Sequence, residues 1–134
     1  MKTKRLVADG TEAATHYEEA VQALRSGELV AFPTETVYGL GALATDEEAV
    51  QSIFTAKGRP SDNPLIVHIG DQEQVREFAR SVDDVAEQLM DAFWPGPLTL
   101  IFYKKENVLA PSVTACLETV GLRMPDHPVA LQLL

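Results

Sequence analysis

The chain has 134 residues, 46% of them hydrophobic and 23% charged, a composition typical of one soluble globular domain over residues 1–134. Its 20 acidic and 11 basic residues give a net charge of −9, which opposes tight nonspecific binding to nucleic acid but leaves room for a local basic cleft. One cysteine excludes an intrachain disulfide, and the scattered histidines give no zinc-ligand spacing, so no metal ligands are predicted. No apolar run is long enough for a signal peptide or a membrane span, which predicts a cytoplasmic protein without a membrane partner.

The first half of the chain alternates between helix and strand patterns. A capping box at Thr15 predicts a helix over residues 15–27, and the apolar run 29–32 predicts a buried strand. A second capping box, at Thr45, predicts a helix that ends near residues 57–58. This alternation favours an α/β or α+β domain.

The second half continues the alternation. Residues 65–69 predict a strand, and residues 72–80 predict a helix. A capping box at Ser81 predicts a further helix over residues 82–93, which the Trp-Pro-Gly-Pro sequence at 94–97 ends.

The last part of the chain predicts two strands and a helix. The strands cover residues 98–103 and 120–124, joined by a loop. Asp126 is suited to cap a final helix, and Pro128 is suited to its first position. This helix has an apolar stripe and reaches Leu134 without a cap, which predicts that the chain is a fragment.

Hydroxyl-bearing side chains and two glycines recur between residues 32 and 41. An extended backbone would place Thr34, Thr36 and Tyr38 on one side, as a polar surface or as residues chosen only for strand propensity. Gly39 and Gly41 would allow close approach of a ligand or another strand. The glycines match a dinucleotide fingerprint weakly, because the expected helix does not open directly from them.

The segment 57–69 gathers groups suited to an anionic ligand. Lys57, Arg59 and Asn63 surround a turn made rigid by two prolines, and His68 lies in the strand that follows. Lys57 also suits a helix C-terminus, and His68 also suits an ordinary surface position, whereas the planar guanidinium of Arg59 is well shaped for phosphate.

A lone charge interrupts the last predicted strand. If Arg123 faces inward it needs a carboxylate, which a protein side chain or a ligand can supply. Thr119 lies four residues earlier. Cys116 is expected to be a small buried filler, and His127 a turn residue.

Four motifs together, at residues 32–41, 57–68, 94–99 and 123–128, closely resemble the YrdC-like family of threonylcarbamoyl-adenylate synthases. The resemblance implies an α/β fold with a twisted mixed sheet, flanked by helices around an open cleft. It implies that L-threonine, bicarbonate and ATP are joined into threonylcarbamoyl-adenylate and pyrophosphate, with Mg²⁺ accompanying the nucleotide. The product then feeds the modification of a tRNA adenosine, so tRNA or the tRNA-modification machinery is an implied partner.

The resemblance also assigns site residues. The threonine-binding positions are Thr36, His68 and Arg123, with Arg123 pairing the carboxylate. The ATP-binding positions are Lys57, Arg59, Asn63 and Thr119. The carboxylated amino acid is its own nucleophile, so catalysis rests on positioning and charge neutralisation by Lys57 and Arg59.

The sequence departs from the family at its end, because family members continue with a Ser-Ala-Asn segment and residues that close over ATP. The resemblance therefore implies a truncated chain or a poor nucleotide site. Two other functions stay open: a noncatalytic module binding double-stranded RNA, which the acidity disfavours, and a carbamoyl-transfer domain of the same fold.

Overall fold

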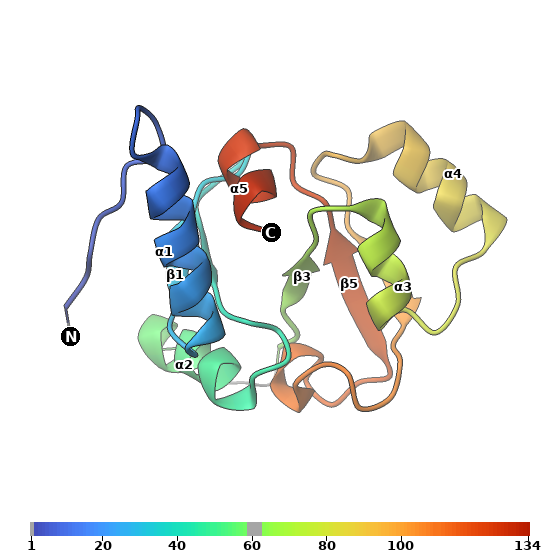
Figure 1. Cartoon of the computed structure of the whole chain (residues 1–134). Coiled ribbons are helices and arrows are strands. Elements are labelled where there is room, and N and C mark those ends of the chain that lie inside the picture. The colour runs from blue at the N-terminus through green and yellow to red at the C-terminus, as the bar shows by residue number, and fades with distance from the viewer. Residues whose placement is uncertain (1, 59–62) are drawn as a thin grey trace.

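The computed structural model describes residues 2–58 and 63–134, in which short helices and short strands alternate (Figure 1). The helices are α1 (Ala13–Arg25), α2 (Glu47–Lys57), α3 (Val75–Phe78), α4 (Asp84–Phe93) and α5 (Pro128–Leu133). The strands are β1 (Val30–Phe32), β2 (Gly39–Gly41), β3 (Ile66–His68), β4 (Leu100–Tyr103) and β5 (Thr119–Arg123). Short 3-10 turns form η1 (Gln72–Gln74) and η2 (Pro111–Val113).

The strands form two separate sheets. Strands β1 and β2 are an antiparallel hairpin, whereas β3, β5 and β4 form a mixed sheet with β5 in the centre. Strand β3 runs parallel to β5 and β4 runs antiparallel to it. The expected α/β fold with a mixed sheet flanked by helices is confirmed.

Most buried side chains belong to one cluster, the main core. It lies on the face of the mixed sheet that carries Val67, Val120 and Leu122, and α2, α4 and η2 contribute to it. Leu122 is completely buried. Along β5, buried residues alternate with half-buried ones, as expected for a strand with one face on the core.

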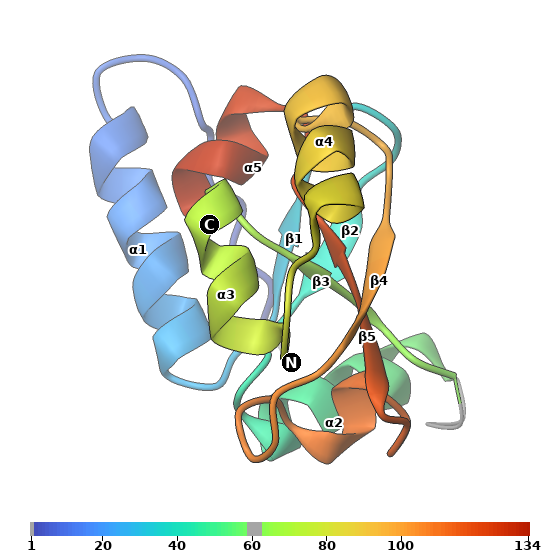
Figure 2. The ribbon, with the colours of Figure 1, turned by 90° about the vertical axis from the view of Figure 1, so that its right-hand side faces the viewer.

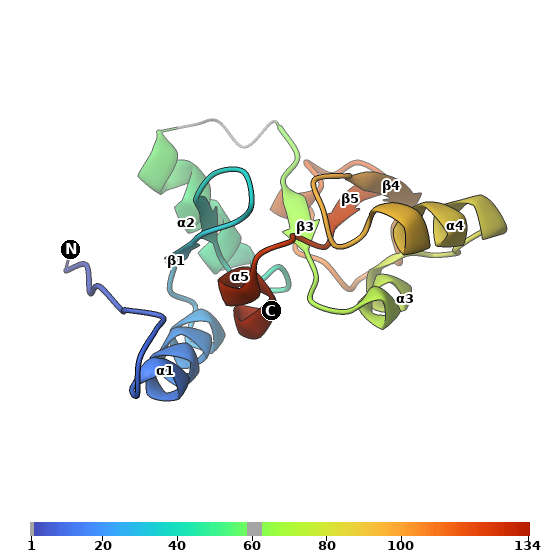
Figure 3. The same ribbon diagram turned by 90° about the horizontal axis from the view of Figure 1, so that it is seen from above.

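A second group of buried residues, the small cluster, consists of Ala20, Phe32, Ala130 and Leu133. These residues come from α1, β1 and α5, so the small cluster joins an early helix to the last one. Seen from above, α1, α5 and the hairpin lie to one side, and β4, β5, α3 and α4 lie to the other (Figure 3). The side view shows α5 between α1 and α4 (Figure 2).

The helices begin at other residues than the predicted capping boxes indicate. Helix α1 begins at Ala13, earlier than the Thr15 box predicts, and no side chain caps it. Asp46 caps α2 by accepting a hydrogen bond from the Ala49 amide, and Asp83 caps α4 in the same way. In both helices the cap lies one or two residues beyond the predicted Thr45 or Ser81. Its carboxylate accepts a hydrogen bond from an amide of the first turn that has no partner within the helix.

Three smaller expectations were also corrected. The helix expected over residues 72–80 is split into η1 and α3. His127, not Asp126, caps α5, since its Nδ1 accepts from the Val129 amide, whereas Pro128 occupies the first helical position as predicted. Cys116 is exposed rather than buried, and it lies in a turn with a positive φ of 61°.

Candidate functional site

Two predicted site residues are neighbours on the mixed sheet. The parallel register of β3 and β5 pairs His68 with Arg123. Side chains alternate along a strand, so both residues lie on the face opposite Val67 and Leu122. We call this surface the site face.

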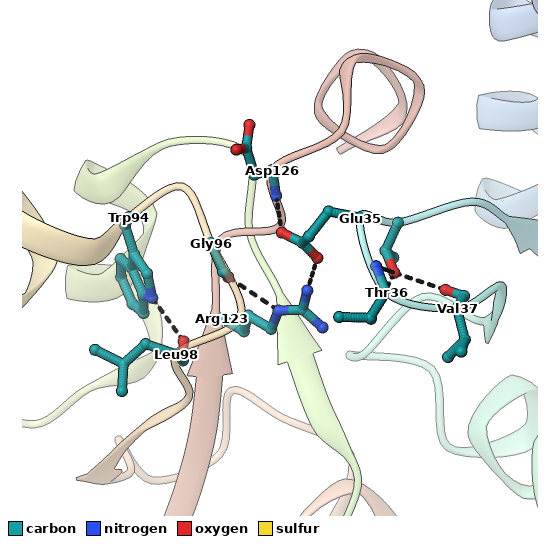
Figure 4. A network of polar contacts seen from close by, with 9 residues as sticks. Glu35, Thr36, Val37, Trp94, Gly96, Leu98, Arg123 and Asp126 are labelled. Carbon is teal, nitrogen blue, oxygen red and sulfur yellow. Dashed lines mark hydrogen bonds and ion pairs between the residues drawn. The ribbon is translucent and has the colours of Figure 1, made fainter.

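Arg123 is held by a backbone carbonyl and a carboxylate (Figure 4). Its Nε donates a hydrogen bond of 3.0 Å to the Gly96 carbonyl oxygen, and its Nη2 forms an ion pair with Glu35 Oε1. The Arg123 side chain is only 11% exposed, and this burial lowers the pKa of its guanidinium, which nonetheless stays protonated. The carboxylate that an inward-facing arginine requires is therefore supplied by this protein.

Glu35 connects three segments of the chain. Besides its ion pair with Arg123, its Oε2 accepts a hydrogen bond of 2.5 Å from the Asp126 amide. Glu35 lies in the loop between β1 and β2, Arg123 ends β5, and Asp126 precedes α5. The carboxylate thus joins the hairpin to the mixed sheet.

The predicted extended strand through residues 34–38 is wrong, because these residues form a turn. The Thr34 hydroxyl accepts from the Thr36 amide at 3.2 Å and donates to the Val37 carbonyl at 2.6 Å. Such side-chain bonds to the local backbone compete with strand pairing. The turn directs Glu35 toward Arg123 and leaves Thr36 exposed, with its hydroxyl 3.0 Å from that of Thr34.

The Trp-Pro-Gly-Pro segment positions the carbonyl that Arg123 uses. Trp94 Nε1 donates to the Leu98 carbonyl at 2.7 Å, and the Gly96 amide donates to the Met124 carbonyl at 2.8 Å. A Cβ at position 96 would lie 2.5 Å from the Phe93 carbonyl oxygen, so this close approach requires glycine. The turn is thereby fixed against the end of β5.

His68 is partly buried beside an aromatic ring. The Phe32 ring packs edge-to-face against it, with centroids 5.8 Å apart. Burial lowers the pKa of His68, and a hydrogen bond with the Ile66 backbone opposes this only in part. The neutral imidazole is therefore favoured near pH 7, with one nitrogen able to donate and the other to accept a hydrogen bond.

The predicted nucleotide-binding residues lie farther apart than His68 and Arg123 do. Lys57 is exposed at the end of α2, and Asn63 is exposed ahead of β3. Thr119 begins β5, about 13 Å from Arg123 at the usual rise per strand residue. In the part of the chain that the structure describes, no hydrogen bond joins Lys57, Asn63 and Thr119 to one another. Arg59 lies outside the described residues.

Sequence reasoning missed Glu35 and Gly96. The signal for Glu35 was present, because a lone arginine in a strand requires a carboxylate, but the sequence does not show which one. The role of Gly96 depends on its backbone carbonyl, which no residue pattern identifies.

Within residues 2–58 and 63–134, no group of three or more His, Cys, Asp and Glu side chains could hold a metal ion. No helix within these ranges is sufficiently long and apolar to span a bilayer.

A mixed sheet that places a histidine beside a nearly buried arginine defines an α/β domain with polar residues on one face of the sheet. The Sua5/YciO/YrdC family model, described as "Telomere recombination", matches residues 22–134. The chain belongs to this family, which confirms the resemblance seen in the sequence.

Known relatives are longer than this chain. It is 56% identical over 138 residues to the threonylcarbamoyl-AMP synthase of Bacillus subtilis, covering 100% of this chain and 40% of that protein. The structure of Pyrococcus abyssi Sua5 complexed with L-threonine matches with a TM-score of 0.86 and 54% identity, over 89% of this chain and 35% of that one. Escherichia coli YciO matches with a TM-score of 0.76 and 28% identity, over 88% of this chain and 57% of that one. The chain thus spans about two fifths of the curated Bacillus relative.

Proposed function

We propose that this chain is part of a threonylcarbamoyl-AMP synthase, a nucleotidyltransferase that forms threonylcarbamoyl-adenylate and pyrophosphate from L-threonine, bicarbonate and ATP. The observation that carries the proposal is the pairing of His68 with Arg123 on the site face, beside the loop that bears Thr36. Relatives named as this enzyme, and a relative's structure with L-threonine, support it.

The amino acid would bind at the Arg123 end of the site face. Arginine has five N–H donors: Gly96 takes the one on Nε, and the buried Nη2 faces Glu35, so the two on Nη1 remain for a substrate carboxylate. Neutral His68 would exchange a hydrogen bond with the threonine hydroxyl, and the exposed Thr36 hydroxyl would add another.

The nucleotide would bind toward the other end of β5. In this proposal Lys57 and Arg59 neutralise phosphate charge, and Asn63 and Thr119 hydrogen-bond to the nucleotide. Mg²⁺ would arrive on the triphosphate, because the described residues offer it no cluster of protein ligands.

The proposed reaction needs no nucleophile from the enzyme. The threonine amine adds to bicarbonate and releases water, which gives a carbamate. A carbamate oxygen then attacks the α-phosphorus of ATP and displaces pyrophosphate. The chain's contribution is to hold the two substrates in line and to neutralise the charge that develops on the phosphate.

We also propose that the product donates its threonylcarbamoyl group to a tRNA adenosine and that this activity is cytoplasmic. Direct RNA binding by this chain is the weaker proposal, because its net charge of −9 opposes attraction to phosphate.

Isothermal titration of the 134-residue chain with L-threonine, ATP and RNA separates these functions. Binding of threonine, strengthened by ATP, is expected. Heat that appears only with RNA would overturn the synthase proposal, and binding of carbamoyl phosphate without threonine would favour carbamoyl transfer.

Variants at three positions test the division of the site between threonine and ATP. Arg123→Ala should weaken threonine binding at least tenfold with little effect on ATP, whereas Arg59→Ala or Lys57→Ala should weaken ATP binding. Lys105→Ala, which removes another exposed lysine, is the matched control and should change neither affinity. Equal small effects of all variants on both ligands would contradict the residue assignment.

A further inference from the structure

Glu35, in the loop between β1 and β2, contacts Arg123 of the site face and has no role in the proposed function. Its side chain is 21% exposed although the loop around it is exposed, and both of its oxygens are engaged. Neighbouring Val37 and Tyr38 are 73% and 74% exposed, so the turn half-buries the Glu35 carboxylate and leaves these larger side chains in solvent. This arrangement is the reverse of ordinary surface placement.

The charge balance around Arg123 follows from this contact. An isolated, nearly buried guanidinium would attract any carboxylate, since Coulomb interactions strengthen away from water. The ion pair with Glu35 makes the pair neutral overall. An anionic ligand is then attracted by Arg123 and repelled by Glu35 over similar distances, and much of its attraction is lost.

A zwitterionic ligand avoids this loss. Its carboxylate can use the remaining N–H donors of Arg123, and its ammonium group can face the Glu35 carboxylate. Figure 4 shows the second terminal nitrogen of Arg123 directed away from Glu35. Two opposite charges on the ligand then match two opposite charges on the protein.

We propose that Glu35 is a specificity-determining residue, which holds Arg123 in place and makes the site select a zwitterionic α-amino acid over the corresponding hydroxy acid. The inference rests on the proposed function, since it concerns the same amino-acid site. Beyond the proposed function, Glu35 acts on the ligand's ammonium group directly and on its carboxylate through Arg123.

Two simpler roles for Glu35 predict different behaviour. If Glu35 only fills the space that a substrate carboxylate takes, its removal would strengthen binding of every carboxylate. If it only stabilises the fold, its removal would weaken all ligands equally. A selectivity ratio distinguishes the three roles, whereas stability alone does not.

The test compares L-threonine with 2,3-dihydroxybutanoate, which has a hydroxyl in place of the ammonium group. Both are titrated calorimetrically into the 134-residue chain and into Glu35→Gln, which keeps an acceptor oxygen for the Asp126 amide but removes the charge. We expect Glu35→Gln to weaken threonine binding about tenfold and to strengthen dihydroxybutanoate binding severalfold. Glu35→Asp should restore most of the preference, and Glu28→Gln, at an exposed glutamate, should leave it unchanged.

Each other outcome overturns the inference. Tighter binding of both ligands by Glu35→Gln would make Glu35 a space-filling competitor, and equal losses would make it a structural residue. If the unsubstituted chain binds neither ligand, the proposed function itself fails for this chain, and the inference fails with it. Threonine binding that depends on Arg123 but not on Glu35 would spare the function and refute only the inference.

Discussion

The main core and the small cluster are built in different ways. The main core joins residues of the central sheet, α2, α4 and η2, and includes side chains such as Leu122 that water does not reach. The small cluster has four buried residues, and α1 and α5 supply most of them. A large core of mixed elements holds its strands rigidly, whereas a small cluster depends on a few contacts.

The candidate site lies across these two regions. His68 and Arg123 belong to strands of the main core, whereas Glu35 and Thr36 belong to the hairpin loop beyond Phe32, a member of the small cluster. The ion pair of Glu35 with Arg123 and the ring contact of Phe32 with His68 join the regions. The geometry of the site therefore depends on how the small cluster packs against the main core.

The largest effect is expected from a cavity in the main core. Leu122→Ala removes a fully buried side chain from the central strand, and it should lower the free energy of unfolding by about 2–5 kcal/mol. Urea denaturation measures the change. Ile101→Ala, on β4 and 72% exposed, is the control and should cost less than about 1 kcal/mol. Equal costs would show that the main core does not dominate stability.

A cavity in the small cluster should cost less and remain local. Leu133→Ala removes a side chain that is 8% exposed from a short helix, and a loss of about 1–3 kcal/mol is expected. Hydrogen exchange should show faster exchange in α1 and α5 while β5 keeps its protection. Gln132→Ala, at an exposed position of the same helix, should leave exchange unchanged. Loss of protection throughout the chain would mean that the two regions unfold together.

A substitution in the β1–β2 hairpin tests the junction between the small cluster and the main core. A Cβ at Gly41 would lie 2.8 Å from Phe32 Cε1, so Gly41→Ala should displace the Phe32 ring and destabilise the chain by about 1–2 kcal/mol. Gly39→Ala is the control, because its Cβ would lie at an ordinary 3.7 Å from the same ring. Denaturation compares the two variants, and NMR shifts of His68 report the ring displacement. Equal stabilities would exclude a steric role for Gly41.

Sequence reasoning succeeded where neighbouring residues decide the structure. The apolar runs predicted β1, β3, β4 and β5, since a buried strand has a local pattern. It failed at the segment around Thr34, where side-chain bonds to the backbone outweighed strand propensity.

In the candidate site, too, local features were predictable from the sequence and contacts between distant segments were not. His68 and Arg123 were identified from motifs, but their contact depends on the register of two strands about 55 residues apart in sequence, which follows from three-dimensional packing. The partner of Arg123 was predicted as a class of group, a carboxylate, and not as Glu35. Lys57, Asn63 and Thr119 remain predictions as nucleotide-binding residues, and so does Arg59.

The smallest predicted effect concerns the protonation of His68, where the two regions meet. Burial lowers its pKa in the folded state, so between that value and about 6.5 the unfolded chain binds more protons than the folded one. The stabilisation that neutral His68 contributes to the folded state is therefore complete above about pH 6.5. It is lost as the pH falls through the pKa of His68 in the folded chain. Thermal unfolding between pH 7.5 and 5.5 should show a larger loss for the unsubstituted chain than for His68→Asn, which cannot titrate. Parallel pH profiles would show that protonation of His68 does not weaken the packing of Phe32 against the mixed sheet.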